Sequence, residues 1–207
     1  MTEAQLLDLI AGGERTGVEF KGPRRRDEPS FVEVIKAALG LVNRQDPGYI
    51  IIGVRNDGVA LGLAPEQAKT WGDPDLVRQL LLPCGDPPIE ISVDVIEVRS
   101  AKDLAGRTFA AITVHPFERI PVFCRVNREH PKGVAYLKKG ACYVRGLGLP
   151  STTELAGGEE LRELLRVAIS RGVHDFLSTA RAASIPLEAT GPTDIEQFES
   201  QERLLDE

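Results

Sequence analysis

The chain has 207 residues, of which 42% are hydrophobic and 27% charged, and its formal net charge is −6 at pH 7. This length and composition are typical of one globular domain with a real core, plus an appendage. No apolar run approaches the ~20 residues of a membrane span, and the acidic start MTEAQLLDLI lacks the basic segment of a secretory signal. Because Cys84, Cys124 and Cys142 are scattered and odd in number, we expect a cytoplasmic protein rather than a disulfide framework.

The N-terminal part of the sequence predicts helix, strand, helix and strand in turn. Two capping boxes, Thr2 with Gln5 and Ser30 with Glu33, mark the starts of the two helices. The four elements are a helix at 2–13, a strand at 18–21, a buried helix at 29–43 and a strand at 48–54. The last segment, GYIIIGV, is rich in β-branched residues, which is typical of a central strand covered on both faces.

The rest of the chain predicts mostly strands and ends in a helix. The turn RNDG at 55–58 allows residues 59–63 to return as a hairpin partner. The further elements are a helix at 74–83, a cleanly alternating strand at 89–98, a strand at 107–114, two strands within 133–146 and a helix at 153–170. Strands and helices mix without a regular βαβ rhythm. We therefore expect an α+β fold with a mixed, mainly antiparallel sheet packed with helices.

Charge is divided unevenly along the chain. Residues 151–207 carry 12 acidic and 5 basic side chains, whereas residues 1–150 are nearly balanced, with 19 acidic and 20 basic. Periodicity weakens beyond residue 172, so we expect a domain at 1–172 and an acidic tail at 173–207, partly helical or disordered. The domain keeps basic clusters at 24–26 and 138–145. Such local patches, more than total charge, govern association with phosphate.

The segment ERTGVEFKGPRRR, residues 14–26, places acids and bases close together. One interpretation is a solvated edge strand that runs into a charged loop. The other is a site for a polyanion, in which the arginines meet phosphates while the acids hold a cation. Elsewhere the sequence has no C-x-x-C pair and no G-K-[ST] loop. We therefore expect neither zinc binding nor ATP use.

Three ordered segments of the sequence resemble the AlbA-like domain of the Schlafen family. They are GERTGVEFKG, ALGLVNRQDPGYIIIGVRNDGVALGL and PKGVAYLKKGACYVRGLGLPSTTELAGGEEL. In that family an E-x-x-x-x-E-F-K segment precedes a helix ending in A-x-x-N. A G-V-x-x-D-G turn follows the apolar strand, and a late strand reads Y-x-R before Ser/Thr residues. The resemblance covers about residues 1–170 and departs at NRQDPG, which is longer and more charged than the usual N-T-x-G-G connection.

The resemblance implies a function connected with nucleic acid, in one of two forms. Bacterial members are described as DNA-binding or regulatory modules, whereas some vertebrate relatives look like metal-dependent ribonucleases that cut transfer and ribosomal RNA. Their three catalytic acids fall, by motif, on Glu14, Glu19 and Asp57, which would hold Mg²⁺ or Mn²⁺. On a regular strand Glu14 and Glu19 would point to opposite faces, so they can meet only if the chain bends at Gly17 or at Gly12–Gly13.

Basic side chains of these segments are the candidate contacts to the phosphates of structured RNA or double-stranded DNA. They are Lys21, Arg24, Arg25, Arg26, Lys138, Lys139 and Arg145. An aromatic content of 5% argues against extensive stacking on bases. The alternative is a non-catalytic DNA-binding or transcription-regulatory module, in which the acids are structural partners of Lys21 and Arg24.

A homodimer is expected from the same resemblance. Two AlbA-like lobes in one Schlafen chain form a clamp around folded RNA, whereas this sequence supplies one lobe and no repeat. Candidate interfaces are residues 89–98 and an apolar stripe of the last helix, formed by Leu161, Leu164, Leu165 and Ile169. The other interpretation of this stripe is that it covers the domain's own sheet.

Overall fold

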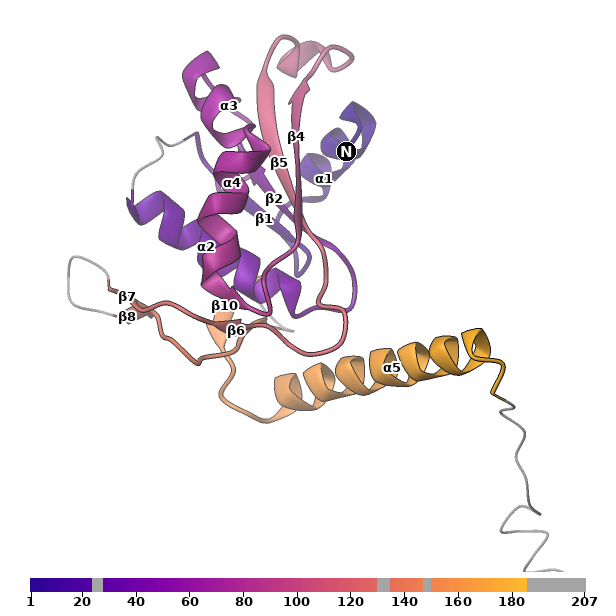
Figure 1. Ribbon diagram of the computed structural model, residues 1–207. Coiled ribbons are helices and arrows are strands. Elements are labelled where there is room, and N and C mark those ends of the chain that lie inside the picture. The colour runs from indigo at the N-terminus through magenta and orange to yellow at the C-terminus, as the bar shows by residue number, and fades with distance from the viewer. Residues whose placement is uncertain (24–27, 130–134, 147–149, 186–207) are drawn as a thin grey trace, which may run out of the picture. The chain divides into compact units, whose positions relative to one another are not determined.

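The computed structural model describes residues 1–23, 28–129, 135–146 and 150–185 (Figure 1). The chain forms two compact units, Met1–Ile169 and Ser170–Glu207. In the described ranges, no helix is both long enough and apolar enough to cross a membrane.

A four-stranded sheet forms the centre of the first unit. Its strands follow the order β1, β2, β5, β4, and they span Val18–Lys21, Gly48–Ile52, Thr108–Val114 and Ile91–Glu97. β1 runs parallel to β2, and the other two pairings are antiparallel. With helices packed on both faces, this arrangement confirms the predicted α+β fold with a mixed, mainly antiparallel sheet.

β2 is covered on both faces, as its apolar sequence predicts. Ile50 and Ile52 belong to the larger core cluster, which holds much of helix α2 (Glu28–Val42). Ile51 belongs to a second cluster, which includes Leu6 and Leu9 of helix α1 (Glu3–Gly12). Figure 1 shows α1 and α2 on either side of the strands.

The two predicted capping boxes have different outcomes. Thr2 and Gln5 form theirs, since each side chain accepts a hydrogen bond from the other residue's backbone N–H, at 3.3 and 2.8 Å. The box at Ser30 and Glu33 is wrong, because α2 already begins at Glu28 and both residues lie inside the helix. The side chain of Glu33 is therefore not needed at the helix start, and it lies 3.6 Å from the ammonium of Lys21.

Smaller elements complete the fold. They are helices α3 (Pro65–Trp71), α4 (Pro74–Leu81), η1 (Leu82–Cys84) and η2 (Lys102–Leu104), and strands β3 (Gly85–Asp86), β6 (Phe123–Cys124), β7 (Arg128–Glu129), β8 (Ala135–Leu137), β9 (Tyr143–Arg145) and β10 (Thr152–Glu154). The sequence predicts α4 and the strands β8 and β9, but it does not predict α3. β8 pairs with β7, and β9 pairs with β10.

Three other predictions differ from the structure. Residues 59–63 form no strand, because their pairings are isolated bridges to two different segments, Ala60 to Val54 and Leu63 to Thr108 of β5. β4 does not alternate cleanly, since it lies at the edge of the sheet and its middle residues, 93 and 94, are both half-buried. The last helix, α5, spans Glu159–Ala182 rather than 153–170, because Thr152–Glu154 pair with β9 as β10.

Candidate functional site

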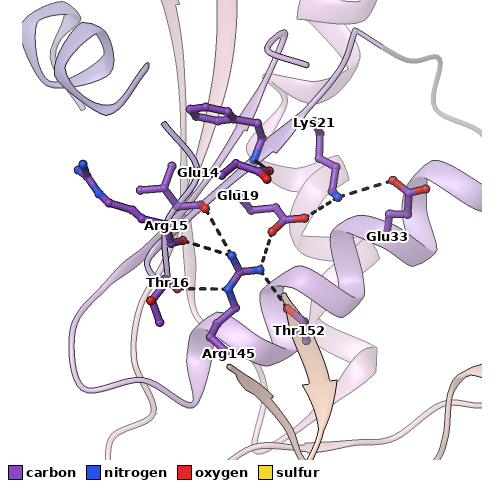
Figure 2. Close-up of polar contacts among 10 residues, drawn as sticks. Glu14, Arg15, Thr16, Glu19, Lys21, Glu33, Arg145 and Thr152 are labelled. Carbon is purple, nitrogen blue, oxygen red and sulfur yellow. Dashed lines mark hydrogen bonds and ion pairs between the residues drawn. The ribbon is translucent and has the colours of Figure 1, made fainter. Parts of the chain in front are cut away.

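A buried arginine links the end of β9 to the start of β1. The side chain of Arg145 is 1% exposed, and its Nη1 lies 2.5 Å from Oε2 of Glu19 (Figure 2). The same guanidinium donates to the carbonyls of Thr16 (3.2 Å) and Arg15 (3.3 Å) and to Oγ1 of Thr152 (3.3 Å). A guanidinium presents five donors in a rigid fork, so one side chain can hold several acceptors at once.

The strand register explains why Arg145 and Thr152 meet. In the β9–β10 pair they lie directly opposite each other. Thr152 also packs on α2, because a Cβ placed on Gly40 would come within 2.6 Å of its side chain. The Y-x-R sequence and the Ser/Thr residues after it thus form one hairpin that closes on α2 and β1.

Glu14 and Glu19 come together because the chain turns between them. Arg15 and Val18 exchange backbone hydrogen bonds of 3.3 and 2.9 Å. This turn returns Glu14 to β1, where its Oε1 accepts the Phe20 N–H at 2.8 Å. Burial raises the pKa of the Glu14 carboxyl; the Phe20 hydrogen bond opposes this shift, and the nearby Glu19 carboxylate adds to it. The bend that their convergence requires therefore lies at residues 15–18.

Gly17 lies close to the residue that follows α2. A Cβ at this position would lie 2.7 Å from Nη1 of Arg44, the flexible end of a side chain that can move aside. The Gly17 carbonyl also accepts the Tyr49 N–H at 2.9 Å, and this bond fixes the turn to the first residues of β2.

Lys21 is an internal partner of the acids. Its Nζ lies 2.6 Å from Oε1 of Glu19 and 3.6 Å from Oε2 of Glu33, and the Lys21 and Glu19 side chains are each 14% exposed. Both carboxylate oxygens of Glu19 therefore contact a cation, Lys21 on one side and Arg145 on the other (Figure 2). Sequence reasoning missed Glu33 as a site residue. Its one signal was a carboxylate on a helix that is otherwise mostly apolar.

Asp57 does not join Glu14 and Glu19. It lies in the exposed turn after β2, where its Oδ2 is 2.5 Å from Nη2 of Arg55 and its Oδ1 accepts the Val59 N–H at 3.2 Å. Across the described ranges, no three His, Cys, Asp or Glu side chains are placed to hold one metal ion. Since both oxygens of Glu19 also contact cations, the acids in this arrangement do not fit a three-carboxylate site for Mg²⁺ or Mn²⁺.

The predicted phosphate contacts lie in different environments. Arg24, Arg25 and Arg26 lie outside the described residues. Lys138 and Lys139 are exposed; Lys138 pairs with Glu154 at 2.7 Å, and this hydrogen bond raises the Lys138 pKa. The expectation for Arg145 is corrected, because a side chain that is 1% exposed and bonded on all sides does not present its charge to a phosphate.

The asparagine of the A-x-x-N sequence has an architectural role. Asn43 is buried just after α2, and its Oδ1 accepts the Val122 N–H at 2.8 Å. Its Nδ2 donates to the carbonyls of Val122 and Tyr143, each at 2.9 Å. One side chain thus fixes the end of α2 to two distant segments, one of which is β9.

We call Glu14, Glu19, Lys21, Glu33 and Arg145 the charged cluster. The fold and the charged cluster define an α+β domain in which a late hairpin closes on the first strand through a buried arginine. A sequence profile of the family described as "Schlafen, AlbA_2" matches residues 14–145, more than half of the chain. The chain belongs to this family, which associates it with nucleic acids.

No curated protein matches the chain significantly. Among solved structures, the DIP2311 protein from Corynebacterium diphtheriae is similar at 17% identity with a TM-score of 0.44. That match covers 77% of this chain and 27% of the other, so this chain corresponds to a minor part of that protein.

Proposed function

We propose that this chain is a nucleic-acid-binding protein that holds the phosphate backbone of structured RNA or double-stranded DNA. The observation that carries the proposal is the family match, which begins at Glu14 and ends at Arg145, two residues of the charged cluster in Figure 2. Backbone contacts supply most of the affinity in non-specific complexes, and they need exposed cations more than aromatic residues.

The charge balance of the cluster supports a binding role without catalysis. Glu19 is neutralised by Lys21 and Arg145, and Lys21 also faces Glu33. The acids are therefore bound internally and repel an approaching phosphate less than unpaired carboxylates would. The three arginines at 24–26 follow β1 directly in the sequence, which makes them the first candidates for the phosphate contact.

A metal-dependent endoribonuclease is the second candidate function. The convergence of Glu14 and Glu19 favours it, since a regular strand would separate these two carboxylates. For this activity Asp57 would have to join them, with Mg²⁺ or Mn²⁺ as cofactor. It would also have to exchange its contact with Arg55 for the metal.

Binding is tested by fluorescence anisotropy with labelled tRNA, an rRNA hairpin and a DNA duplex, each over a salt series. Reversing Arg24, Arg25 and Arg26 to glutamate should weaken binding to all three ligands. It should also reduce the slope of log K against log salt by about 0.7–0.9 for each lost phosphate contact. The control reverses three other exposed cations, Arg78, Arg99 and Lys102. An equal loss in both triple variants would attribute the effect to net charge and remove residues 24–26 from the interface.

Cleavage is tested on the same RNAs with Mn²⁺, Mg²⁺ or EDTA, read on a sequencing gel. Fragments that need the metal and disappear in Asp57→Ala would establish the ribonuclease. Binding without fragments in either metal would leave the non-catalytic module. Binding of none of the three ligands by wild type at low salt would refute the proposed function itself.

We also propose that the protein acts as a homodimer in the cytoplasm. One 22.5 kDa lobe offers few phosphate contacts, and a two-fold pair would double them without new sequence. Cys84, Cys124 and Cys142 are buried and unpaired, which supports a reducing compartment.

A further inference from the structure

Residues 122–127 form an extended segment with one face in the core and the other face exposed. Cys124 is 2% exposed and belongs to the larger core cluster. Phe123 is 45% exposed, and Arg125 and Asn127 are exposed as well. Alternate side chains of an extended chain point to opposite faces, so Phe123, Arg125 and Asn127 share the outer face of the segment.

Hydrogen bonds on both sides hold this segment in place. The Arg125 N–H donates to the Cys84 carbonyl, and the Cys124 N–H donates to the Ala141 carbonyl, each at 2.8 Å. On the Cys84 side, β6 pairs with β3 outside the four-stranded sheet (Figure 1). A fixed backbone therefore presents the exposed ring of Phe123, and such a ring loses little conformational entropy when a ligand covers it.

Two exposed cations lie beside the ring of Phe123. Arg125 is two residues further along the same face, which is about 7 Å on an extended chain. Asn127 holds Lys139 at this segment, because its Oδ1 accepts the Lys139 N–H at 2.8 Å. Within the described ranges, neither Arg125 nor Lys139 forms an ion pair. Both charges are therefore available to an external anion.

A carboxylate lies on the other side of the ring. Asp86 is exposed and lies directly opposite Phe123 in the β3–β6 pair, so the two side chains share one face. A carboxylate repels a phosphate, but it accepts hydrogen bonds from the amino groups of cytosine and adenine. The order along this face is acid, ring and cations, which matches the edge, the face and the phosphates of a nucleotide.

We propose that this face binds an unpaired nucleotide of structured RNA. The base stacks on Phe123, with its amino group at Asp86. The flanking phosphates contact Arg125 and Lys139. We call these four residues the nucleotide subsite. Stacking on a side chain requires a base that is free of its neighbours, and loops and bulges supply such bases whereas a regular duplex does not. The inference rests on the proposed nucleic-acid binding and adds a preference for unpaired bases.

The preference is tested by fluorescence anisotropy with an RNA duplex that carries a bulge of unpaired cytidines and with the same duplex without the bulge. We expect wild type to bind the bulged RNA about fivefold more tightly or better, the low end of what stacking on an aromatic side chain contributes. Phe123→Leu keeps an apolar side chain but removes the ring, so it should abolish this preference and retain the affinity for the plain duplex. Phe123→Tyr should keep the preference. The matched control is Phe176→Leu at another exposed phenylalanine, and it should change neither affinity.

The charged residues of the subsite are tested on the bulged RNA. Arg125→Gln combined with Lys139→Gln should weaken binding and lower the slope of log K against log salt by about 0.7 for each lost contact. Uridine carries a carbonyl where cytidine carries the amino group, so wild type should bind a uridine bulge less tightly. Asp86→Ala should remove this difference. Equal binding of the two bulges by wild type would exclude Asp86 from the subsite.

Phe123→Trp gives a measurement that does not depend on affinity. An indole stacked on a base is in direct contact with it, so saturating bulged RNA should quench the fluorescence of the new tryptophan. Trp71 is 2% exposed, so the same RNA should leave the fluorescence of wild type unchanged. Without quenching in Phe123→Trp, the base does not lie on this ring.

The remaining outcomes separate the nucleotide subsite from the proposed function. Equal affinity of wild type for the bulged and the plain duplex, or an unchanged preference in Phe123→Leu, would overturn the subsite and keep nucleic-acid binding. An equal loss of both RNAs in Phe123→Leu would assign the ring to folding and would also overturn the subsite. Binding of neither RNA by wild type would refute the proposed function itself.

Discussion

Replacing Arg145 by methionine should destabilise the protein more than any other single change at the charged cluster. Methionine keeps the apolar stem and removes the guanidinium, so Oε2 of Glu19, the carbonyls of Arg15 and Thr16, and Oγ1 of Thr152 lose a donor together. Removing one partner of a buried ion pair costs about 3–5 kcal/mol. Because Glu19 still has Lys21 at 2.6 Å, the cost of leaving its carboxylate without Arg145 lies at the low end of this range. The carbonyls of Arg15 and Thr16, which also lose their donor, add to this cost. We expect a loss of about 4 kcal/mol.

The assay is urea unfolding followed by the fluorescence of Trp71, the single tryptophan, which is 2% exposed in the larger core cluster. With a slope of about 2 kcal/mol/M, the loss moves the midpoint down by about 2 M. Arg145→Lys is the matched control, because it keeps the charge but not the fork, and about half of the loss should return. In a double-mutant cycle with Glu19→Gln, the two changes should cost less together than the sum of the single changes. A methionine variant within about 0.5 kcal/mol of wild type would refute the central role of this arginine.

Two further changes test the other parts of the cluster. Burial raises the pKa of Glu14, so the stability that its protonated form contributes is complete below the usual carboxyl value near 4.5 and is lost as pH rises through the raised value. Glu14→Gln stays neutral and still accepts the Phe20 N–H. Urea unfolding should therefore find this variant at least as stable as wild type at pH 7, and the difference in stability should shrink as pH falls to 4. The opposite trend would contradict the burial of this carboxyl. Asn43→Ala should cost about 3 kcal/mol by thermal or urea unfolding, because it removes three hydrogen bonds of 2.8–2.9 Å to buried backbone. Asn43→Asp should keep the acceptor for the Val122 N–H. An alanine variant as stable as wild type would show that Asn43 does not anchor α2.

The local parts of the fold were predictable because their signals are local. The apolar run at 48–54 identified β2, and the Thr2 and Gln5 pair identified the start of α1. The Ser30 and Glu33 pair carried the same signal but lies inside α2, since a capping pattern also arises by chance within a helix. The sequence predicts that the last helix begins at residue 153, because it does not show that residues 152–154 can pair in register with β9.

The candidate site was predictable in part. The acids at 14 and 19 required a bend, and the sequence identified Gly17 as one place for it; the structure has that bend at residues 15–18. The sequence left two roles open for Lys21, a phosphate contact or a structural partner of the acids, and in the structure Lys21 pairs with Glu19 and Glu33. The role of Arg145 could not be read from the chain, because its partners are distant in sequence. Arg145 finds the carboxylate of Glu19 126 residues away, and only the fold makes that pairing visible.

The distance along the chain between Glu19 and Arg145 also sets an order of events during synthesis. At ~5–20 residues per second, 126 residues take roughly 6–25 s to be added after Glu19. During that interval Glu19 has been synthesised but Arg145, its ion-pair partner, has not. Asn43 at the end of α2 likewise lacks its acceptor, the Tyr143 carbonyl, which follows 100 residues later. Contacts of such long separation are slow to form, because the closure of a long loop precedes their gain. The nascent domain therefore stays open at its first strand until its last hairpin emerges.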